Sequence, residues 1–478
     1  MDLKRLITTW ETKGCLKRIG EPVNAELEVT EIVRRVFSEK GPVLLFENVK
    51  AAKMPLVTNI FGTWERIWDI FGVDSQESLI SRVRPLLDLE PPKGLVDKAR
   101  ALWKMKGVAG NLPKETGKAR CQSQVFPGDE VNLGDLPVMK CWPDDAGRFI
   151  TLPVVITKDP ESGIQNLGMY RMQVIDGKRT AMHWHPGKGA DIHYRKWKKL
   201  GKPLPAACAL GCEPAVTYSA SAPLPPDINE LIFAGMLMDQ PVEMVKCKTV
   251  DLMVPAQSQI VLEGYVDGSQ TFPEGPFGDH TGYYTPQRPF PIFHITAITT
   301  DNDPVYPSTV VGWPPFEDAL LGTLTERIFL PFIKFVIPDI TDMALPVAGL
   351  FHNFVFASID KRYPGQAYKT MDSIWGLGQL STSKVVVVFD SDVDLRQEND
   401  VLFHLGNSID PLRDVVIKKG PLDILDHASL EEGFGGKMGI DATRKLPEEG
   451  HKRPWPQRAV MDEETIRKID GLWNRLGL

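Results

Sequence analysis

The chain has 478 residues, of which 42% are hydrophobic and 24% are charged, the composition of a globular protein with roughly three domains. Its formal net charge of −7 leaves no basic surplus, which argues against nucleic-acid binding as the main function. The first residues lack the apolar core of a signal peptide, no apolar run is long enough to span a bilayer, and the six cysteines show no paired framework. We therefore expect a cytoplasmic protein with reduced thiols.

Residues 1–115 are predicted to form an α/β domain. Apolar residues recur at helical spacing between Leu27 and Val36, and the apolar run Val43–Phe46 is typical of a short buried strand.

Residues 116–312 have a different pattern, in which short strands alternate with turn signals such as Asp159-Pro160 and Asp267-Gly268. This spacing predicts a β-barrel or sandwich with helical insertions. The basic run at 195–199 is predicted to be a solvated helix face.

Within this part, Gly168–Ile175 is predicted to be a strand that ends in a hairpin turn at Asp176-Gly177. Strict alternation would place Asn166 and Tyr170 on one face and Arg171 on the other. The three can serve one site only if the strand is irregular near Gly168, where a glycine permits a bulge. Arg171 is either an edge-strand residue with its head in solvent or the partner of buried acids.

Two such acids occur in the segment 274–282, which reads Glu-Gly-Pro-Phe-Gly-Asp-His-Thr-Gly. Its glycines and proline cannot sustain a helix, so the backbone must turn and can aim Glu274 and Asp279 into one cavity. Paired carboxylates in a shared cavity are suited to proton transfer. The alternative is an ordinary surface loop with two solvated acids.

The last part, residues 313–478, is predicted to be a second α/β domain. A helix is expected from Glu317 to Leu330, ended or kinked by Pro331, followed by a buried strand at Lys384–Asp390 and a helix at Asp394–Leu405.

The terminal segment Met461–Leu476 is an amphipathic helix by its spacing, with an apolar stripe formed by Ile466, Ile469, Leu472, Trp473 and Leu476. The stripe must be buried either against its own domain or against another subunit.

Together with the segments 165–175 and 434–445, these motifs closely resemble the UbiD family of decarboxylases over nearly the whole chain. The resemblance is greatest to the 4-hydroxy-3-polyprenylbenzoate decarboxylase branch. It implies an α+β multidomain fold: an N-terminal α/β domain (1–115), a central split β-barrel of the flavin-reductase type that binds prenylated FMN (116–312), and a C-terminal α/β oligomerisation domain with its linking helix (313–478).

The resemblance also implies the site residues. Arg171, Glu274 and Asp279 would be catalytic, with Arg171 orienting the substrate carboxylate and Asp279 delivering the proton. The metal ligands for Mn²⁺ or Mg²⁺ would be Asn166, His193 and Glu230, although His183 and His185 lie near enough in sequence to leave the choice of histidine open. The cofactor-binding set is Asn166, Leu167, Gly168, Met169, Tyr170, Arg171, Ile192, His193, Glu230 and Lys437.

In that family a K⁺ site uses backbone carbonyls near 219–222 together with Glu230, and Lys437 would contact the flavin phosphate. The alternative for Lys437 is a solvated loop lysine. Trp313 and Phe316 would border the substrate pocket, or would simply belong to a core at a domain junction.

The expected function is non-oxidative, possibly reversible decarboxylation of an aromatic or α,β-unsaturated acid, with a 4-hydroxy-3-polyprenylbenzoate-type substrate as the best guess. A UbiX-type flavin prenyltransferase would supply the cofactor, and the enzyme would be a homodimer or homohexamer. The alternatives are a subunit of an aryl carboxylase, an inactive paralogue, a flavin reductase on the same barrel, or a structural oligomer. The reductase is disfavoured because no Gly-x-Gly-x-x-Gly follows a strand.

Overall fold

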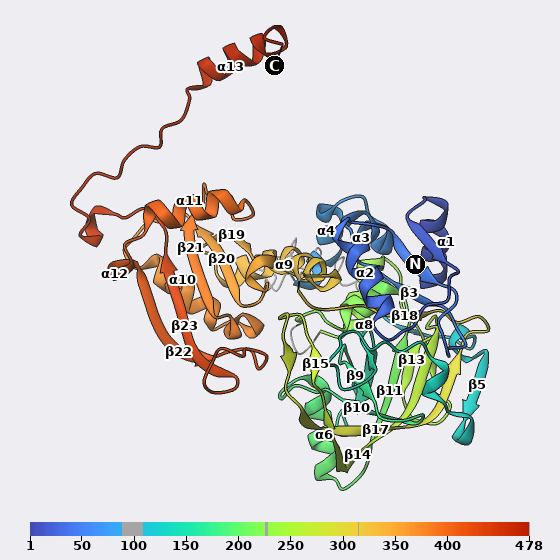
Figure 1. Ribbon diagram of the computed structural model, residues 1–478. Coiled ribbons are helices and arrows are strands. Elements are labelled where there is room, and N and C mark those ends of the chain that lie inside the picture. Colours follow the sequence, from blue (N-terminus) through green and yellow to red (C-terminus); the bar gives the residue numbers. More distant parts are fainter. Residues whose placement is uncertain (88–108, 225–227, 314, 478) are drawn as a thin grey trace.

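The computed structural model describes residues 1–87, 109–224, 228–313 and 315–477. The segment 88–108 of the predicted N-terminal domain, and Pro314 at the start of the predicted third domain, lie outside the described residues. Two large bodies are visible in Figure 1, and helix α9 (Glu317–Val336) runs between them. The fold is a mixed α/β multidomain one.

The N-terminal part carries a four-stranded sheet in the order β1-β2-β3-β18, in which β18 comes from far along the chain. The predicted strand Val43–Phe46 is confirmed as β2, with all four side chains buried, and the predicted helix is confirmed as α2. The elements of this part are α1 (Leu3–Thr12), β1 (Leu16–Ile19), α2 (Glu28–Ser38), β2 (Val43–Phe46), β3 (Leu56–Thr58), α3 (Trp64–Phe71), α4 (Gln76–Leu87) and β18 (Tyr306–Pro307).

The central part is built on a nine-stranded sheet in the order β6-β9-β10-β17-β14-β11-β7-β8, with β5 paired to β17. The path is open at β6 and at β8, and no closed barrel is found among the strands of the described residues. The strands are β5 (Gln124–Pro127), β6 (Phe149–Ile150), β7 (Val154–Lys158), β8 (Gln165–Gly168), β9 (Met172–Val174), β10 (Arg179–Met182), β11 (Leu204–Leu210), β14 (Ile260–Glu274) and β17 (Arg288–Thr300).

The remaining elements of this part surround the large sheet. They are the small-sheet strands β4 (Lys114–Glu115), β12 (Glu243–Lys246) and β13 (Met253–Pro255), the hairpin β15 (Phe277–Gly278) and β16 (Tyr284–Thr285), the helices α6 (Gly189–Lys199), α7 (Pro214–Ser219) and α8 (Glu230–Met238), and the short 3-10 helices η1 (Arg120–Gln122), η2 (Gly128–Glu130) and η3 (Leu133–Asp135). The basic run 195–199 lies at the end of α6 and is mostly exposed, as predicted.

The C-terminal part carries a five-stranded sheet in the order β19-β20-β21-β23-β22. Its central strand β21 confirms the predicted buried strand, with every side chain buried. The elements are β19 (Ile340–Ala344), η4 (Val347–Gly349), β20 (Phe354–Ile359), α10 (Gln366–Trp375), η5 (Gly378–Thr382), β21 (Val385–Asp390), α11 (Glu398–Ser408), α12 (Pro411–Asp414), β22 (Val415–Pro421), β23 (Phe434–Asp441) and η6 (Pro447–Glu449).

Two helix boundaries differ from the prediction. Helix α9 does not end at Pro331 but continues to Val336, because Phe329 and Ile333 on either side of the proline are buried in the core. Helix α11 begins at Glu398 rather than at Asp394, because the Asp394 carboxylate accepts the backbone N–H of Arg396 at 3.0 Å and holds a turn there.

The end of the chain leaves the body of the molecule. Helix α13 (Glu463–Leu472) and the turn η7 (Trp473–Arg475) lie at the tip of an extended segment, well away from the sheets in Figure 1. No residue of α13 is buried, so the intramolecular burial of its apolar stripe is not found. All six cysteines are free, and no helix of the described ranges has the length and apolarity needed to cross a membrane.

Candidate active site

Arg171 lies in a break between two strands. The predicted strand Gly168–Ile175 is in fact two strands, β8 and β9, with residues 169–171 between them. A Cβ at Gly168 would lie 2.2 Å from the Tyr170 ring, so only glycine lets the ring fold back over the strand end. The predicted irregularity therefore lies at and just after Gly168, and the predicted hairpin between β9 and β10 is confirmed.

Arg171 is bound by two carboxylates at once. Its Nε donates to Glu274 Oε1 at 2.8 Å, its Nη2 donates to Glu274 Oε2 at 3.2 Å, and its Nη1 donates to Asp279 Oδ2. Nη2 also donates to Thr285 Oγ1 at 2.9 Å, and the guanidinium stacks 4.5 Å from the centre of the Phe277 ring. The arginine is therefore the buried partner of two acids and not a solvated edge residue.

Glu274 ends strand β14 and is fully buried. His183 Nδ1 lies 3.0 Å from its Oε2, the oxygen that also accepts Arg171 Nη2. Burial alone would raise the pKa of Glu274, but the hydrogen bonds from His183 and Arg171 outweigh burial and hold this pKa below its ordinary value. The carboxylate is therefore ionised at neutral pH.

Asp279 is the second acid, and it lies almost completely buried on the turn after β15. Its Oδ1 accepts both the backbone N–H and the Nδ1 of His280, each at 2.8 Å. Burial opposes ionisation, but His280 and Arg171 together hold the pKa of Asp279 well below its usual range. The same contact outweighs burial and raises the pKa of His280.

A pair of histidines extends the site behind Glu274. His183 Nε2 lies 3.0 Å from His185 Nε2, and the His183 ring packs on Phe290 at 4.3 Å. Burial lowers the pKa of both rings, that of His185 to about 4. Sequence reasoning considered these histidines as metal ligands or as surface residues and missed the contact with Glu274, as it missed Thr285 and His280.

A second cluster joins β8 to α8. Asn166 Nδ2 donates to Glu230 Oε1 at 2.6 Å, and the backbone N–H of Leu167 lies 3.4 Å from Glu230 Oε2. Burial raises the pKa of Glu230. Asn166 Oδ1 is buried without a hydrogen-bond partner, and a Cβ at Gly189, the first residue of α6, would lie 1.7 Å from it. This cluster therefore presents one carboxylate and one unused amide oxygen beside the start of a helix.

His193 lies on α6 against the strand next to Asn166. Its Nδ1 is 2.9 Å from Thr157 Oγ1, and Thr157 is the cross-strand partner of Asn166. Its Nε2 lies 4.0 Å from Asp159 Oδ2. His183 contacts Glu274 and His185 contacts His183, whereas His193 contacts the cross-strand partner of Asn166.

Asn166, Glu230 and His193 carry donor atoms that suit a hard divalent ion. An amide oxygen without a partner, a carboxylate and an imidazole nitrogen whose other nitrogen is held by a hydroxyl are the donors that Mn²⁺ or Mg²⁺ accepts. In the described residues no group of three or more His, Cys, Asp or Glu side chains stands close enough to hold a metal, so Asn166 is essential to any site here.

The other predicted site residues are more scattered. Leu167 is buried, Met169 donates its backbone N–H to Ala220 O at 3.0 Å, and Ile192 is 45% exposed on α6. Trp142 packs edge-on against Phe316 and donates to Val311 O, which places Phe316 in a core, whereas Trp313 is exposed.

Lys437 is not a solvated loop lysine, which was the alternative to the predicted phosphate contact. It lies inside β23, is 2% exposed, and donates from Nζ to Ser381 O and Ser383 O at 2.5 and 2.8 Å. Burial lowers its pKa to about 8. Its ammonium is therefore held by two backbone carbonyls at the end of η5 in the C-terminal part.

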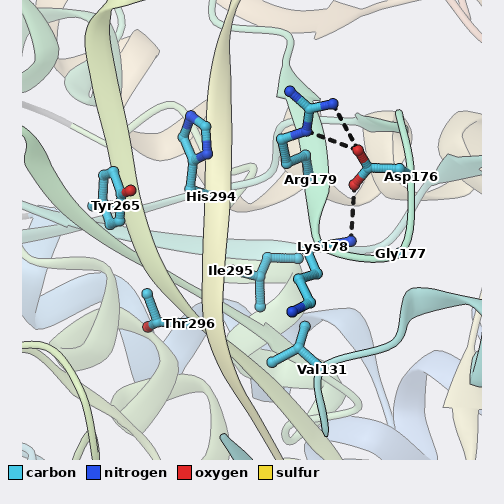
Figure 2. A pocket seen from close by; sticks show the side chains of 9 residues that line it. All are labelled: Val131, Asp176, Gly177, Lys178, Arg179, Tyr265, His294, Ile295 and Thr296. Carbon is cyan, nitrogen blue, oxygen red and sulfur yellow. Dashed lines mark hydrogen bonds and ion pairs between the residues drawn. The ribbon is translucent and has the colours of Figure 1, made fainter. Parts of the chain in front are cut away.

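A surface cavity of about 530 Å³ lies elsewhere on the large sheet (Figure 2). It is lined by Tyr265, His294 and Arg179, and Arg179 is paired with Asp176. None of the predicted site residues lines it, so it is separate from the cluster around Arg171.

Three family models match the chain in order. They are the 3-octaprenyl-4-hydroxybenzoate carboxy-lyase N-terminal domain over residues 7–83, the Rift-related domain over 113–314 and the C-terminal domain over 319–442. The matches define a multidomain carboxy-lyase. The chain belongs to the UbiD family.

Relatives match over the full length. An uncharacterized protein of Aquifex aeolicus is 48% identical over 480 residues, which cover 100% of this chain and 99% of that protein, and one of Archaeoglobus fulgidus is 47% identical over 99% and 98%.

Two solved structures are also similar. The UbiD-class enzyme HmfF from Pelotomaculum thermopropionicum in complex with FMN has a TM-score of 0.80 at 28% identity, covering 98% of this chain and 100% of that one. The vanillic acid decarboxylase of Sedimentibacter hydroxybenzoicus has a TM-score of 0.87 in its closed form at 28% identity, with 99% and 98% covered, and 0.78 in an open form, with 100% and 98% covered.

Proposed function

We propose that this protein removes carbon dioxide, without net oxidation, from an aromatic or α,β-unsaturated carboxylic acid, with prenylated FMN as cofactor. The observation that carries the proposal is the buried Arg171 that Glu274 and Asp279 share. HmfF binds FMN, and an evolved dimeric form of it binds prenylated FMN. We also propose that the open sheet of the central part corresponds to a split β-barrel of the flavin-reductase type.

Asn166, His193 and Glu230 are proposed to hold Mn²⁺ or Mg²⁺, which would offset the negative charge of the flavin phosphate. The unused oxygen of Asn166 and the first turn of α6 beside it support this placement, since backbone N–H groups at a helix start favour phosphate. A K⁺ ion beside Glu230 and the carbonyls near 219–222 remains part of the proposal. Prenylated FMN, when bound, supplies the electron-accepting centre that ordinary side chains lack.

The residues of this chain are proposed to divide the remaining work. Arg171 binds the substrate carboxylate and fixes the bond to be broken, and Glu274 keeps the guanidinium in place from its buried side. Asp279, which touches Arg171 through one oxygen only, gives way to the substrate and then returns a proton to the carbon that has lost carbon dioxide. The burial of both acids keeps bulk water from the reacting carbon.

The substrate is proposed to be a hydroxylated aromatic acid of the 4-hydroxy-3-polyprenylbenzoate type or a related ring acid, and a UbiX-type prenyltransferase to supply the cofactor. The vanillic acid decarboxylase neighbour acts on an aromatic acid, which supports this class. A flavin reductase is not favoured, because the matched family models are those of carboxy-lyases.

The test is production of the protein with and without a flavin prenyltransferase. With it, we expect a modified-flavin absorbance spectrum and release of carbon dioxide from at least one acid in a panel of benzoates, naphthoates and heteroaromatic acids. Protein made without it should bind FMN and be essentially inactive. Oxidation of NADH by the FMN-loaded protein, with no decarboxylation by either preparation, would contradict the proposal.

A further inference from the structure

The acid proposed to deliver the proton is bound to a histidine that has no other partner. Asp279 Oδ1 accepts His280 Nδ1 at 2.8 Å, while the opposite nitrogen, His280 Nε2, is buried without a hydrogen bond. A buried ring nitrogen without a partner is costly for a purely structural contact. It leaves one end of the imidazole on Asp279 and the other end buried without a polar partner.

Residues of the C-terminal part cover this ring. The His280 ring stacks on Phe351 at 5.5 Å and lies 5.1 Å from the His352 ring. Leu350 and Phe351 have φ angles of 55° and 32°, in the left-handed region that larger side chains rarely adopt. Strained backbone of this kind concentrates at functional positions, and here it presents Phe351 to the active-site loop.

The charges around His280 come from four directions. Asp279 lies on the loop of His280 and is tied to Arg171, and Asp318 lies in the first turn of α9. The C-terminal part contributes His352 and Asp423, which stand 3.6 Å apart. The acids outnumber the cations around the ring. Burial opposes its ionisation, yet Asp279 raises the pKa of His280 while its own is depressed, so the proton shared by the pair rests on the histidine.

We infer that Asp279 and His280 form one proton-donating unit, in which His280 stores the proton that Asp279 delivers and the C-terminal part covers the store during the reaction. The inference rests on the proposed function, because only a reaction that consumes a proton at this site needs such a store. It explains how a carboxylate held ionised in the resting protein can act as an acid.

The step balances as follows. The carbon–carboxylate bond breaks, carbon dioxide leaves and the electron pair stays with the substrate carbon. His280 Nδ1 gives its proton to Asp279, and Asp279 passes a proton to the carbon and is left ionised again. His280 is then neutral and keeps its hydrogen on Nε2. When Phe351 and His352 move aside, Nδ1 takes one proton from water, so each turnover consumes one proton from solvent.

The first test needs no cofactor and no substrate. Slow exchange of the imidazole C2 hydrogen, followed by mass spectrometry, gives the pKa of each histidine in the intact protein. We expect the pKa of His280 to lie above those of His183 and His185, and Asp279→Asn to lower it. A His280 pKa that is below the ordinary value, or that Asp279→Asn leaves unchanged, would overturn the inference.

The second test is kinetic. His280→Asn keeps a hydrogen-bond donor near the position of Nδ1 but cannot store a proton. We expect kcat to fall by about 10- to 100-fold, the range for a positioned proton-transfer group, with little change in KM. The limb of the pH profile on which kcat falls with rising pH should move to lower pH in the variant.

His294→Asn is the matched control, because His294 lies on β17 in the separate cavity of Figure 2 and packs on Tyr265. Arg288 on β17 is the cross-strand neighbour of Glu274. His294 is six residues further along β17 than Arg288, which is roughly 20 Å from the site along the strand. An unchanged kcat in His280→Asn, or a lowered kcat with an unmoved limb, would refute the storage role. Failure of the parent protein to decarboxylate any acid would refute the proposed function instead, while the exchange measurement would still decide the pairing.

Discussion

At the scale of single residues, the site is a balance of charges around one guanidinium. Glu274 contacts Arg171 through two oxygens and His183 through one of them, whereas Asp279 contacts Arg171 through a single oxygen. An incoming carboxylate must displace one of these acids, since three anions cannot share one cation in a buried site. The singly bound Asp279 is the one that can leave, and leaving frees it to donate a proton.

We therefore predict that Arg171→Ala and Glu274→Gln each lower turnover by at least about 100-fold, the usual scale for a positioned acid–base group. Arg171→Lys should fall nearly as far, because an ammonium cannot reproduce the two-pronged contact. Steady-state assays on prenylated-FMN-loaded protein would measure this, with circular dichroism to confirm folding. Glu161→Gln, on an exposed turn, is the control, and wild-type turnover in either site variant would disprove the assignment.

His183 lowers the pKa of Glu274, and this effect can be measured. Since its hydrogen bond helps hold the pKa of Glu274 below the ordinary value, His183→Leu should raise that pKa. Activity that needs ionised Glu274 is lost as pH falls through this pKa, so the acid limb of kcat/KM should move to higher pH. His183→Asn keeps a donor and should move the limb less; equal shifts in the two variants would contradict the role.

His185 links stability to pH. Burial holds its pKa at about 4, below the unfolded value of 6.5. Between these values the unfolded chain binds a proton that the folded one does not, so stability falls as pH drops from about 6.5 toward 4. Thermal unfolding of His185→Gln should show a weaker fall over this range than the parent. An unchanged fall in His185→Gln would contradict this linkage.

At the scale of elements, the break between β8 and β9 positions Arg171. A methyl group at Gly168 would overlap the Tyr170 ring, so Gly168→Ala must shift the residues that lead to Arg171. We predict a loss of stability of about 1–3 kcal/mol, the usual cost of overpacking, and a large loss of activity. Gly436→Ala, where a Cβ meets nothing within 4 Å, should leave both unchanged. Chemical denaturation and turnover assays measure the two effects.

The break between β8 and β9 is one of several features that could be predicted from the sequence. Alternation and a glycine predicted an irregular strand, and the buried runs Val43–Phe46 and Lys384–Asp390 predicted strands that the structure has. The helix ends at Pro331 and Asp394 were wrong, because core packing and a side-chain turn act beyond local propensity. Two contacts could not be predicted from sequence. The His183–Glu274 contact joins segments about a hundred residues apart. The His280–Asp279 contact depends on which nitrogen of the ring faces the carboxylate.

At the scale of the whole molecule, the active-site loop lies at the junction of the two bodies. Arg288 is ion-paired with Glu432, and the Tyr283 ring packs on His427 at 4.2 Å. These contacts cross from the central part to the C-terminal part beside Asp279. The better match to the closed form of the vanillic acid decarboxylase, with a TM-score of 0.87 against 0.78 for an open form, agrees with this arrangement.

The terminal helix α13 has an apolar stripe that nothing in the described residues of the single chain buries. Ile466, Ile469, Trp473 and Leu476 form an apolar stripe, and Trp473 is 51% exposed. An apolar stripe of this kind at the tip of an extended segment marks an interaction surface, because its burial against a partner removes apolar area from water. A second copy of this chain is the partner that we expect.

We therefore predict a homo-oligomer whose mass in light scattering is a multiple of 53.4 kDa. A chain ending at Val460 should shift toward the monomer, and so should the pair Ile469→Asp and Trp473→Asp, because a charge on the stripe opposes its burial. Lys468→Asp, which changes charge on the exposed α13 without altering the named apolar residues, is the control and should keep the parent's mass. A monomeric parent would show that the stripe serves another purpose. An oligomer that survives both changes would place the interface on the C-terminal sheet or its helices instead.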